Sequence, residues 1–346
     1  MGFEIEDGVL VKYIHEKGDT EITVPDGVTS IGNRAFSNCS NLTEITIPDS
    51  VTDINPNAFE KCHCLIRINI PANVEYIDSS AFEECYNLTE IIVDKNNSLY
   101  CDTDGVLFSK DKKTVISFPA GKTETTYIIP DTVTEIDDEA FSDCSNLTNI
   151  TIPYSVKSIG ISSFVRCNSL VEIKVSPDNS SFCDIDGVLF SMDKKTIIYF
   201  PNGKPENTYI IPDGVTSIGD CAFENCCLEK IIIPDSVNHI GYSAFDTCRY
   251  LTDINIPANV SCIDEWTFYE CNNLRSIVIP DSVTFICGSA FEYCNRLTDI
   301  TIPDSVTFIS KWAFNNCSSL ETVSVPSQLR GKLDGIFPSH TEITYR

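Results

Sequence analysis

The chain has 346 residues and a formal net charge of -26 at pH 7, because 50 acidic residues outnumber 24 basic ones. Proteins that bind nucleic acid need clustered lysine and arginine, so this charge argues against a nucleic acid partner. No apolar run approaches the roughly 20 residues that a membrane-spanning helix requires, and we expect no membrane insertion.

The N-terminal residues predict a cap. Asp7 to Leu10 opens a β-rich segment, Gly18 and Asp19 mark a turn, and Glu21 to Val24 returns as a second run. A stack of repeats exposes unpaired strand edges and bare core at its ends, so a cap is needed there. We therefore assign residues 1–30 to an N-terminal hairpin cap.

The sequence phrase Ala-Phe-x-x-Cys-x-x-Leu recurs along the chain, usually at a step of 23 residues. A fixed period in this range indicates one structural unit stacked many times, which is a solenoid. Such a stack has no single deep cleft, and this favours a binding surface over an active site. The repeated phenylalanines are Phe36, Phe59, Phe82, Phe141, Phe164, Phe223, Phe245, Phe268, Phe291 and Phe314.

One repeat predicts two short strands and one turn. Apolar residues at spacings of three and two from Leu42 to Ile47 indicate a strand, which Pro48 ends. Val51 and Ile54 indicate a second inward-facing strand. The spacing from Ala58 to Leu65 predicts one short α or 3-10 turn that carries Phe59 into the core. Ladders of identical residues in successive coils then form the core.

Two intervals between repeat phenylalanines are 59 rather than 23 residues, and the two inserted segments resemble each other. Each segment has two β-rich runs around a short polar tip with lysines, which predicts a hairpin. We expect hairpin insertions at residues 94–129 and 176–211. The tip lysines are Lys110, Lys112, Lys113, Lys194 and Lys195.

The C-terminal residues predict a second cap at 326–346. Apolar residues from Leu329 to Phe337 indicate a short helix, and Thr341 to Tyr345 indicates a closing strand. No linker composition interrupts the repeats, so we expect one solenoid domain over residues 1–346.

The consensus I-P-D-S-V-T-x-I-x-x-x-A-F-x-x-C-x-x-L-T-x-I-T resembles the BspA-like, treponemal-type leucine-rich repeat over essentially the whole chain. This resemblance implies a right-handed, curved leucine-rich-repeat superhelix of mainly short parallel β-strands. Members of the family resemble bacterial surface proteins that bind host or bacterial partners, which implies an extracellular or cell-surface location. No basic, apolar signal segment follows Met1, so a cytoplasmic location is the alternative.

Ten of the 17 cysteines occupy one repeat position, which places them in the core. A buried free cysteine behaves as a small hydrophobe, so this ladder requires no disulfide. The four histidines are scattered and no C-x-x-C pair occurs, so we expect no zinc and no cofactor. The repeat cysteines are Cys39, Cys62, Cys85, Cys144, Cys167, Cys226, Cys248, Cys271, Cys294 and Cys317.

The outward residue of the second strand changes from mainly polar in the first coils to aromatic in the last ones. Stacked coils would align these residues in one stripe, beside aromatic residues on the adjoining turn. Exposed aromatics in a row are common binding anchors, although they can also pack on one another or under the cap. The predicted partner-binding stripe consists of His239, Cys262, Phe285, Phe308, Trp266, Trp312, Tyr269 and Tyr293.

These patterns predict a noncatalytic protein-binding or adhesion module that presents an extended repeat surface. Its expected ligand is a protein or glycan, on a host or neighbouring bacterial surface. The alternative is a structural spacer or scaffold without a specific ligand, and the lysine tips are a second candidate contact. The sequence lacks the G-x-S-x-G, H-E-x-x-H and phosphate-loop motifs, so we do not expect an enzyme.

Overall fold

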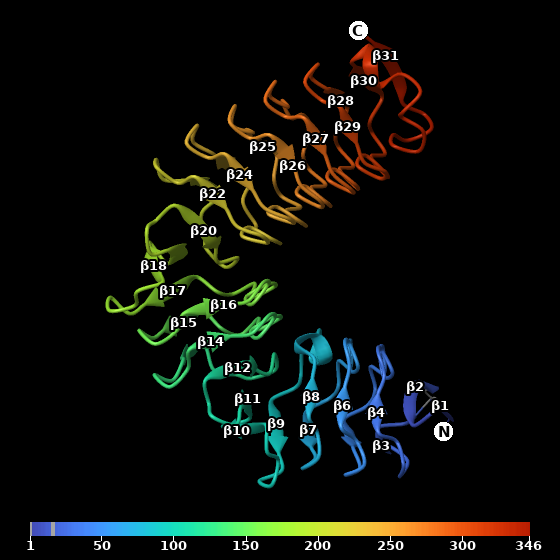
Figure 1. Cartoon of the computed structure of the whole chain (residues 1–346), viewed down its shortest axis with the longest axis vertical. Coiled ribbons are helices and arrows are strands. Elements are labelled where there is room, and N and C mark those ends of the chain that lie inside the picture. Colours follow the sequence, from blue (N-terminus) through green and yellow to red (C-terminus); the bar gives the residue numbers. More distant parts are fainter. Residues whose placement is uncertain (1, 15–17) are drawn as a thin grey trace. The chain divides into compact units, whose positions relative to one another are not determined.

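The computed structural model describes residues 2–14 and 18–346, so Met1 and residues 15–17 of the predicted N-terminal cap lie outside the described part. The chain forms two compact units. Unit 1 comprises Met1–Leu170 and Val175–Ser181, and unit 2 comprises Val171–Lys174 and Phe182–Arg346. Each unit is a stack of short coils, as the repeat predicts, and contains almost no helix (Figure 1).

The first sixteen strands belong to unit 1. They are β1 (Gly2–Glu6), β2 (Val9–Ile14), β3 (Glu21–Thr23), β4 (Ser30–Ile31), β5 (Glu44–Thr46), β6 (Asp53–Ile54), β7 (Arg67–Ile70), β8 (Tyr76–Ile77), β9 (Glu90–Val93), β10 (Tyr100–Thr103), β11 (Val106–Ser109), β12 (Thr114–Ser117), β13 (Thr126–Ile128), β14 (Glu135–Ile136), β15 (Asn149–Ile152) and β16 (Ser158–Ile159).

The remaining strands are β17 (Glu172–Val175), β18 (Phe182–Ile185), β19 (Val188–Ser191), β20 (Thr196–Tyr199), β21 (Thr208–Ile210), β22 (Ser217–Ile218), β23 (Lys230–Ile232), β24 (His239–Ile240), β25 (Asp253–Ile254), β26 (Cys262–Ile263), β27 (Phe285–Ile286), β28 (Asp299–Thr301), β29 (Phe308–Ile309), β30 (Thr322–Val325) and β31 (Glu342–Tyr345). Two 3-10 helices, η1 (Ser79–Phe82) and η2 (Ser327–Leu329), complete the described elements.

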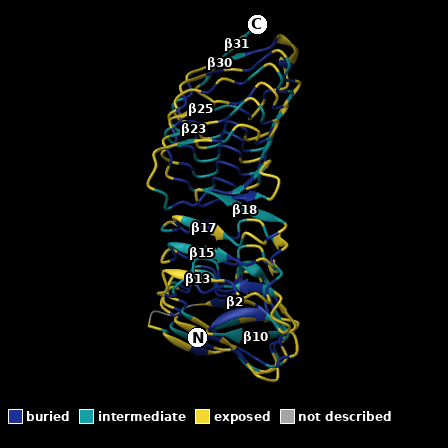
Figure 2. Ribbon diagram, turned by 90° about the vertical axis from the view of Figure 1, so that its left-hand side faces the viewer, coloured by how far each residue is buried: buried dark blue, intermediate teal, exposed yellow. Residues whose placement is uncertain are grey.

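Most regular coils contribute one main strand and one second strand, and each kind pairs in parallel with its neighbours. In unit 1 the main strands follow the order β3-β5-β7-β9, with Ile45 opposite Ile68 and Ile68 opposite Ile91. The second strands β4, β6 and β8 align in the same way. All three isoleucines are buried. Figure 2 shows buried and exposed segments alternating along the coils. Like residues therefore stack into ladders, as the repeat predicts.

The largest fully buried side chains of the core are phenylalanines, and their rings stack from coil to coil. The rings of Phe36 and Phe59 are stacked with centroids 5.4 Å apart, and those of Phe291 and Phe314 are 5.0 Å apart. Each inserted segment adds one phenylalanine to this ladder, and this residue lies outside the Ala-Phe-x-x-Cys-x-x-Leu motif. Phe118 stacks on the Phe141 ring, and Phe200 likewise stacks on Phe223. The insertions therefore continue the core.

The turn that carries each phenylalanine is a continuous 3-10 helix only in η1 among the described repeat positions. In the preceding coil it is a run of reverse turns, in which Asn57 and Lys61 take left-handed φ angles of 56° and 60°. Left-handed residues interrupt a helix. The amide of Phe59 instead donates to the carbonyl of Ala81 in the next coil, at 2.9 Å. Hydrogen bonds between coils thus replace those of a helix.

The predicted hairpin around each lysine tip is present. Strands β11 and β12 pair antiparallel, with Phe108 opposite Val115. The sequence did not reveal β10, which pairs antiparallel with β11 across the Asp104–Gly105 turn. Strand β12 also pairs in parallel with β14, so the second strand of the hairpin takes the place of a second strand in the stack of coils. Strands β18, β19, β20 and β22 repeat this arrangement in unit 2.

The predicted N-terminal hairpin between Asp7–Leu10 and Glu21–Val24 is wrong. The chain turns instead at Asp7 and Gly8, which have left-handed φ angles, and Glu21–Thr23 is the first main strand, paired in parallel with β5. At the N-terminus, β1 and β2 form an antiparallel hairpin, and β2 pairs in parallel with β4. At the C-terminus, the helix predicted from Leu329 to Phe337 is wrong, because the 3-10 turn η2 ends at Leu329 and turns follow it. The predicted closing strand at the C-terminus is present. Strand β31 pairs in parallel with β30. Each end of the described chain thus adds a strand to a sheet that would otherwise have a free edge.

Candidate binding surfaces

An aligned row of side chains lies on the second strands of unit 2. Cys262 is opposite Phe285, and Phe285 is opposite Phe308, in the parallel sheet β26-β27-β29 (Figure 1). The next residue of each strand is a buried isoleucine, so the row faces outward. Phe285 and Phe308 are 48% and 53% exposed. His239 is also exposed, at the same position on β24.

The predicted aromatic residues of the turn form a separate cluster. The Trp266 ring lies 6.2 Å from that of Tyr269, which contacts Tyr293 edge-on at 5.6 Å. Tyr242 joins this cluster, 5.4 Å from Trp266. The sequence analysis missed Tyr242, although it lies next to the glycine after β24. Trp312 is 60% exposed. We call the row and these turn residues together the C-terminal aromatic surface.

Cys262 is half-buried, with its Sγ atom 3.6 Å from that of Cys287. Burial and this neighbouring thiol raise the Cys262 pKa to about 12, so the side chain is a neutral thiol at pH 7. Trp266 and Trp312 have left-handed φ angles of 56° and 62°. Most other coils have a left-handed residue at the same position, such as Arg34, Asn57 and Ser243, so this conformation belongs to the repeat turn.

The lysine tips are exposed but carry compensating carboxylates. At the first tip the Asp111 carboxylate accepts hydrogen bonds from the Ser109 hydroxyl and the Lys113 amide. These hydrogen bonds, with the nearby lysine charge, lower the pKa of Asp111. The Lys112 ammonium donates to the Thr103 hydroxyl at 3.0 Å. Asp193 closes the second tip in the same way, so neither tip is a purely basic patch.

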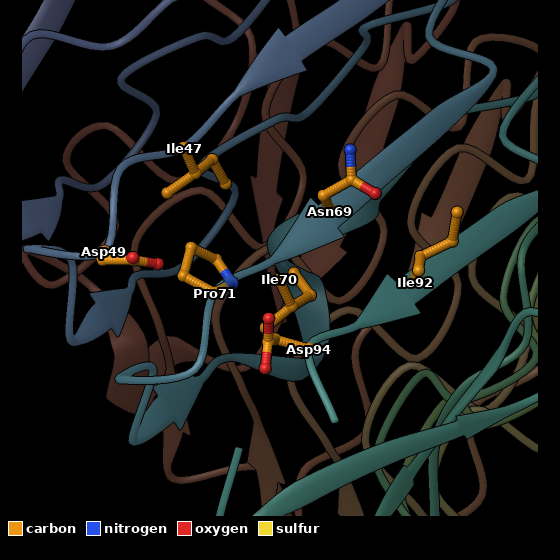
Figure 3. A pocket seen from close by; sticks show the side chains of 7 residues that line it. All are labelled: Ile47, Asp49, Asn69, Ile70, Pro71, Ile92 and Asp94. Carbon is orange, nitrogen blue, oxygen red and sulfur yellow. The ribbon is translucent and has the colours of Figure 1, made fainter. Parts of the chain in front are cut away.

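A cavity of about 280 Å³ opens on the main-strand face of unit 1 (Figure 3). It lies over three successive coils, where the main strands β5, β7 and β9 end. Apolar side chains and two carboxylates line it together. The lining residues are Ile47, Asp49, Asn69, Ile70, Pro71, Ile92 and Asp94. The sequence analysis did not bring the two aspartates together.

Within residues 2–14 and 18–346 no cluster of three histidine, cysteine or acidic side chains has metal-site geometry. The described helices are all too short to cross a membrane. All 17 cysteines are free thiols, and the ten repeat cysteines are buried as predicted. The structure therefore offers surfaces and shallow cavities as its candidate sites.

Stacked coils with a Leu-x-x-Ile-x-Ile strand define a leucine-rich-repeat solenoid, a class that acts by presenting surfaces. The family model described as BspA type leucine rich repeat region (6 copies) matches residues 15–123, 117–206 and 200–321. The chain belongs to this BspA-type family. Comparison with curated proteins finds no significant match.

Two solved structures are similar over nearly the whole chain. A leucine rich cell surface protein from Faecalibacterium prausnitzii is 31% identical, with 97% of this chain and 95% of that chain covered and a TM-score of 0.59. The pneumococcal vaccine antigen PcpA is 20% identical, with 99% and 95% covered and a TM-score of 0.57. The second likeness concerns the fold alone.

Proposed function

We propose that this protein is a noncatalytic binding module that attaches to a protein partner through the C-terminal aromatic surface. The proposal rests on the aligned and exposed Phe285 and Phe308. Large aromatic side chains bury much area at little entropic cost, and for this reason they anchor protein interfaces. The exposed Trp312 lends support, because it adds a further large aromatic side chain to this surface.

We further propose a cell-surface or extracellular site of action, and a partner on a host or neighbouring bacterial surface. Support comes from the F. prausnitzii relative, which is described as a cell surface protein. A glycan is the alternative class of ligand.

The test is capture of partners from intact cells and extracellular matrix, with glycan arrays in parallel. Wild type is compared with Phe285→Ser/Phe308→Ser, and we expect the double variant to lose affinity by about tenfold or more with an unchanged melting temperature. A matched control is Ile128→Ser/Ile210→Ser, which removes two isoleucines that are 73% and 65% exposed elsewhere. Equal loss in both variants would contradict the assigned surface.

The spacer hypothesis makes the opposite prediction. If the protein only separates other domains or copies, the phenylalanine variant gains solubility and nothing is captured by either form. Capture that survives the phenylalanine changes and disappears when Lys110, Lys112 and Lys113 become Gln would move the site to the lysine tips.

A further inference from the structure

Two half-buried thiols are in contact on the second-strand face of unit 2. Cys262 begins β26, and Cys287 follows directly after β27. Their Sγ atoms lie 3.6 Å apart, and both residues are free thiols. This separation is van der Waals contact, so the two sulfur atoms already face each other without a bond between them.

The parallel sheet holds both thiols on its outward face. Ile263 is opposite Ile286, and Cys287 follows Ile286, so the two cysteines lie diagonally across the strand pair. Both isoleucines are buried, and the residues on either side of a buried strand residue face outward. The Cys287 amide donates to the Ile263 carbonyl at 2.9 Å, which fixes the backbone next to the pair.

The same diagonal brings side chains together elsewhere in the stack. In unit 1 the corresponding residues are Ser30 and Asn55, on coils that pair in the same register. The Asn55 side-chain amide donates to the Ser30 hydroxyl at 2.7 Å. Contact between these two positions is therefore a property of the fold. Cysteine occupies both of them only at Cys262 and Cys287.

A second thiol pair is closer but is shielded from solvent. The Sγ atoms of Cys226 and Cys248 are 3.2 Å apart, and these residues are 1% and 0% exposed. A dissolved oxidant does not reach such buried thiols while the chain is folded. Of the two pairs, Cys262 and Cys287 alone combine proximity with access to solvent.

We propose that Cys262 and Cys287 form a site of oxidative cross-linking, at which a small-molecule disulfide converts the two thiols into a disulfide between adjacent coils. One cysteine thiolate attacks a sulfur atom of the oxidant, forms a mixed disulfide and releases one thiolate. The other cysteine thiolate attacks the cysteine sulfur of this mixed disulfide and releases the second thiolate. The chain loses two electrons and two protons, and the oxidant gains them as two thiols.

Bond formation needs only a short movement. The distance between the two sulfur atoms must fall from 3.6 Å to ~2.05 Å. Cys287 lies beyond the last residue of β27, and Gly288 follows it. A Cβ atom added at Gly288 would have its nearest neighbours 3.7 Å away, so this side of the coil is open. Rotation of the two side chains and a small shift of this open segment bring the sulfur atoms together.

The surroundings of the pair make the cross-link slow to form and hard to reduce. Burial and the neighbouring thiol raise the pKa of Cys262 to about 12, and burial raises the pKa of Cys287 as well. Thiolates are therefore scarce at pH 7, which slows the exchange. Disulfides are easily reduced where the protein stabilises the reduced form, and this stabilisation is absent here. The cross-link is thus a lasting one.

The test treats the reduced full chain with oxidised glutathione at about pH 8, where more thiolate is present. The remaining thiols are then alkylated in denaturant, and the chain is digested with trypsin. Cleavage after Arg249, Arg275 and Arg296 leaves Cys262 and Cys287 in separate peptides. We expect mass spectrometry to find these two peptides joined, with the loss of two hydrogen atoms.

Single serine variants locate the bond. The same two peptides also contain the repeat cysteines Cys271 and Cys294. The link should disappear in Cys262→Ser and in Cys287→Ser, and a link that persists in either variant would overturn the proposal. Serine occupies the corresponding positions of other coils, at Ser217 and Ser310, so the repeat accommodates both changes.

An exposed thiol of the same unit provides the matched control. Cys227→Ser should leave the link unchanged. Recovery of Cys262 and Cys287 from the oxidised wild type as alkylated thiols, or as two separate glutathione adducts, would also overturn the proposal. The reaction needs no partner, so this test is independent of the proposed function.

Thermal stability gives a second measurement. The bond joins residues 25 positions apart in the sequence, and such a loop constrains the unfolded chain. We expect the oxidised wild type to melt about 4 °C or more above the reduced form. Oxidation should not change the melting temperature of Cys262→Ser. Equal melting temperatures for oxidised and reduced wild type would show that the bond does not hold the coils together.

Discussion

Arg166 joins coils of unit 1 that are far apart in the sequence. Its guanidinium bonds Glu83 at 2.6 Å and Asp143 at 2.7 Å. The other Asp143 oxygen accepts the amide of Glu84 at 2.9 Å. In regular coils that amide donates to a carbonyl of the next turn, as Lys61 does to Glu83. The first insertion omits such a turn, so the Asp143 carboxylate takes the place of the missing carbonyl.

Glu139, near this network, predicts a pH dependence of stability. Burial and the charge of Glu83 raise its pKa from 4.5 to about 7, and its Oε2 atom is buried without a hydrogen-bond partner. The folded state holds the proton of the Glu139 carboxyl group more tightly than the unfolded state does. The resulting contribution to the free energy of unfolding is therefore fully present below pH 4.5. It is lost as pH rises to about 7. In Glu139→Gln we expect a smaller fall in melting temperature over this range.

The matched control is Glu135→Gln, at an exposed position of the same coil. It should retain the wild-type pH profile. Identical profiles for wild type and Glu139→Gln would show that Glu139 does not titrate in this range.

The stacked turns are stabilised by their thiols as well as by their rings. The Cys294 thiol donates to the carbonyl of Phe268, at 3.2 Å, and Cys317 donates to that of Phe291, at 3.0 Å. Each of these carbonyls belongs to the preceding coil. The cysteine position therefore combines the volume of a small apolar group with a weak donor that serves a buried acceptor.

The phenylalanine ladder predicts a graded response to truncation. Phe268 is fully buried, with ring neighbours at 5.4 Å and 5.2 Å on either side. Phe268→Ala should lower the free energy of unfolding by about 3–5 kcal/mol, and Phe268→Leu by less, because leucine leaves a smaller cavity. Urea denaturation followed by circular dichroism measures both. Equal, small losses would indicate that adjacent coils close the gap.

The repeat period sufficed to predict the coils, their strands and the buried Phe and Cys ladders, because ladder positions must be apolar in every copy. It did not reveal left-handed residues such as Asn57 and Lys61, which resemble ordinary solvent-facing residues. The aspartate cavity also escaped notice, because Asp94 is outside the Ile-Pro-Asp motif. The register of strands β5, β7 and β9 is needed to see that Asp94 lines the same cavity as Asp49.

Across the whole molecule, repulsion between acidic side chains is the main electrostatic contribution to stability. A net charge of -26 opposes compaction, and salt screens it. We expect the melting temperature to rise when NaCl increases from about 0.01 M to about 0.15 M, as the screening length falls from ~30 Å to ~8 Å. The Asp131→Asn/Asp213→Asn variant should show a smaller rise. A melting temperature that falls with salt would indicate that specific ion pairs outweigh the repulsion.

The buried repeat cysteines can also be used to follow the local opening of individual coils. Thiolates are the reactive species, and burial raises the pKa of Cys85 and Cys317 to about 12. Cys64 and Cys227, by contrast, are exposed. An alkylating reagent should modify the exposed pair first and the ladder thiols only as their coils open. The order of labelling along the chain would therefore record, without any engineered probe, which coils separate from their neighbours first.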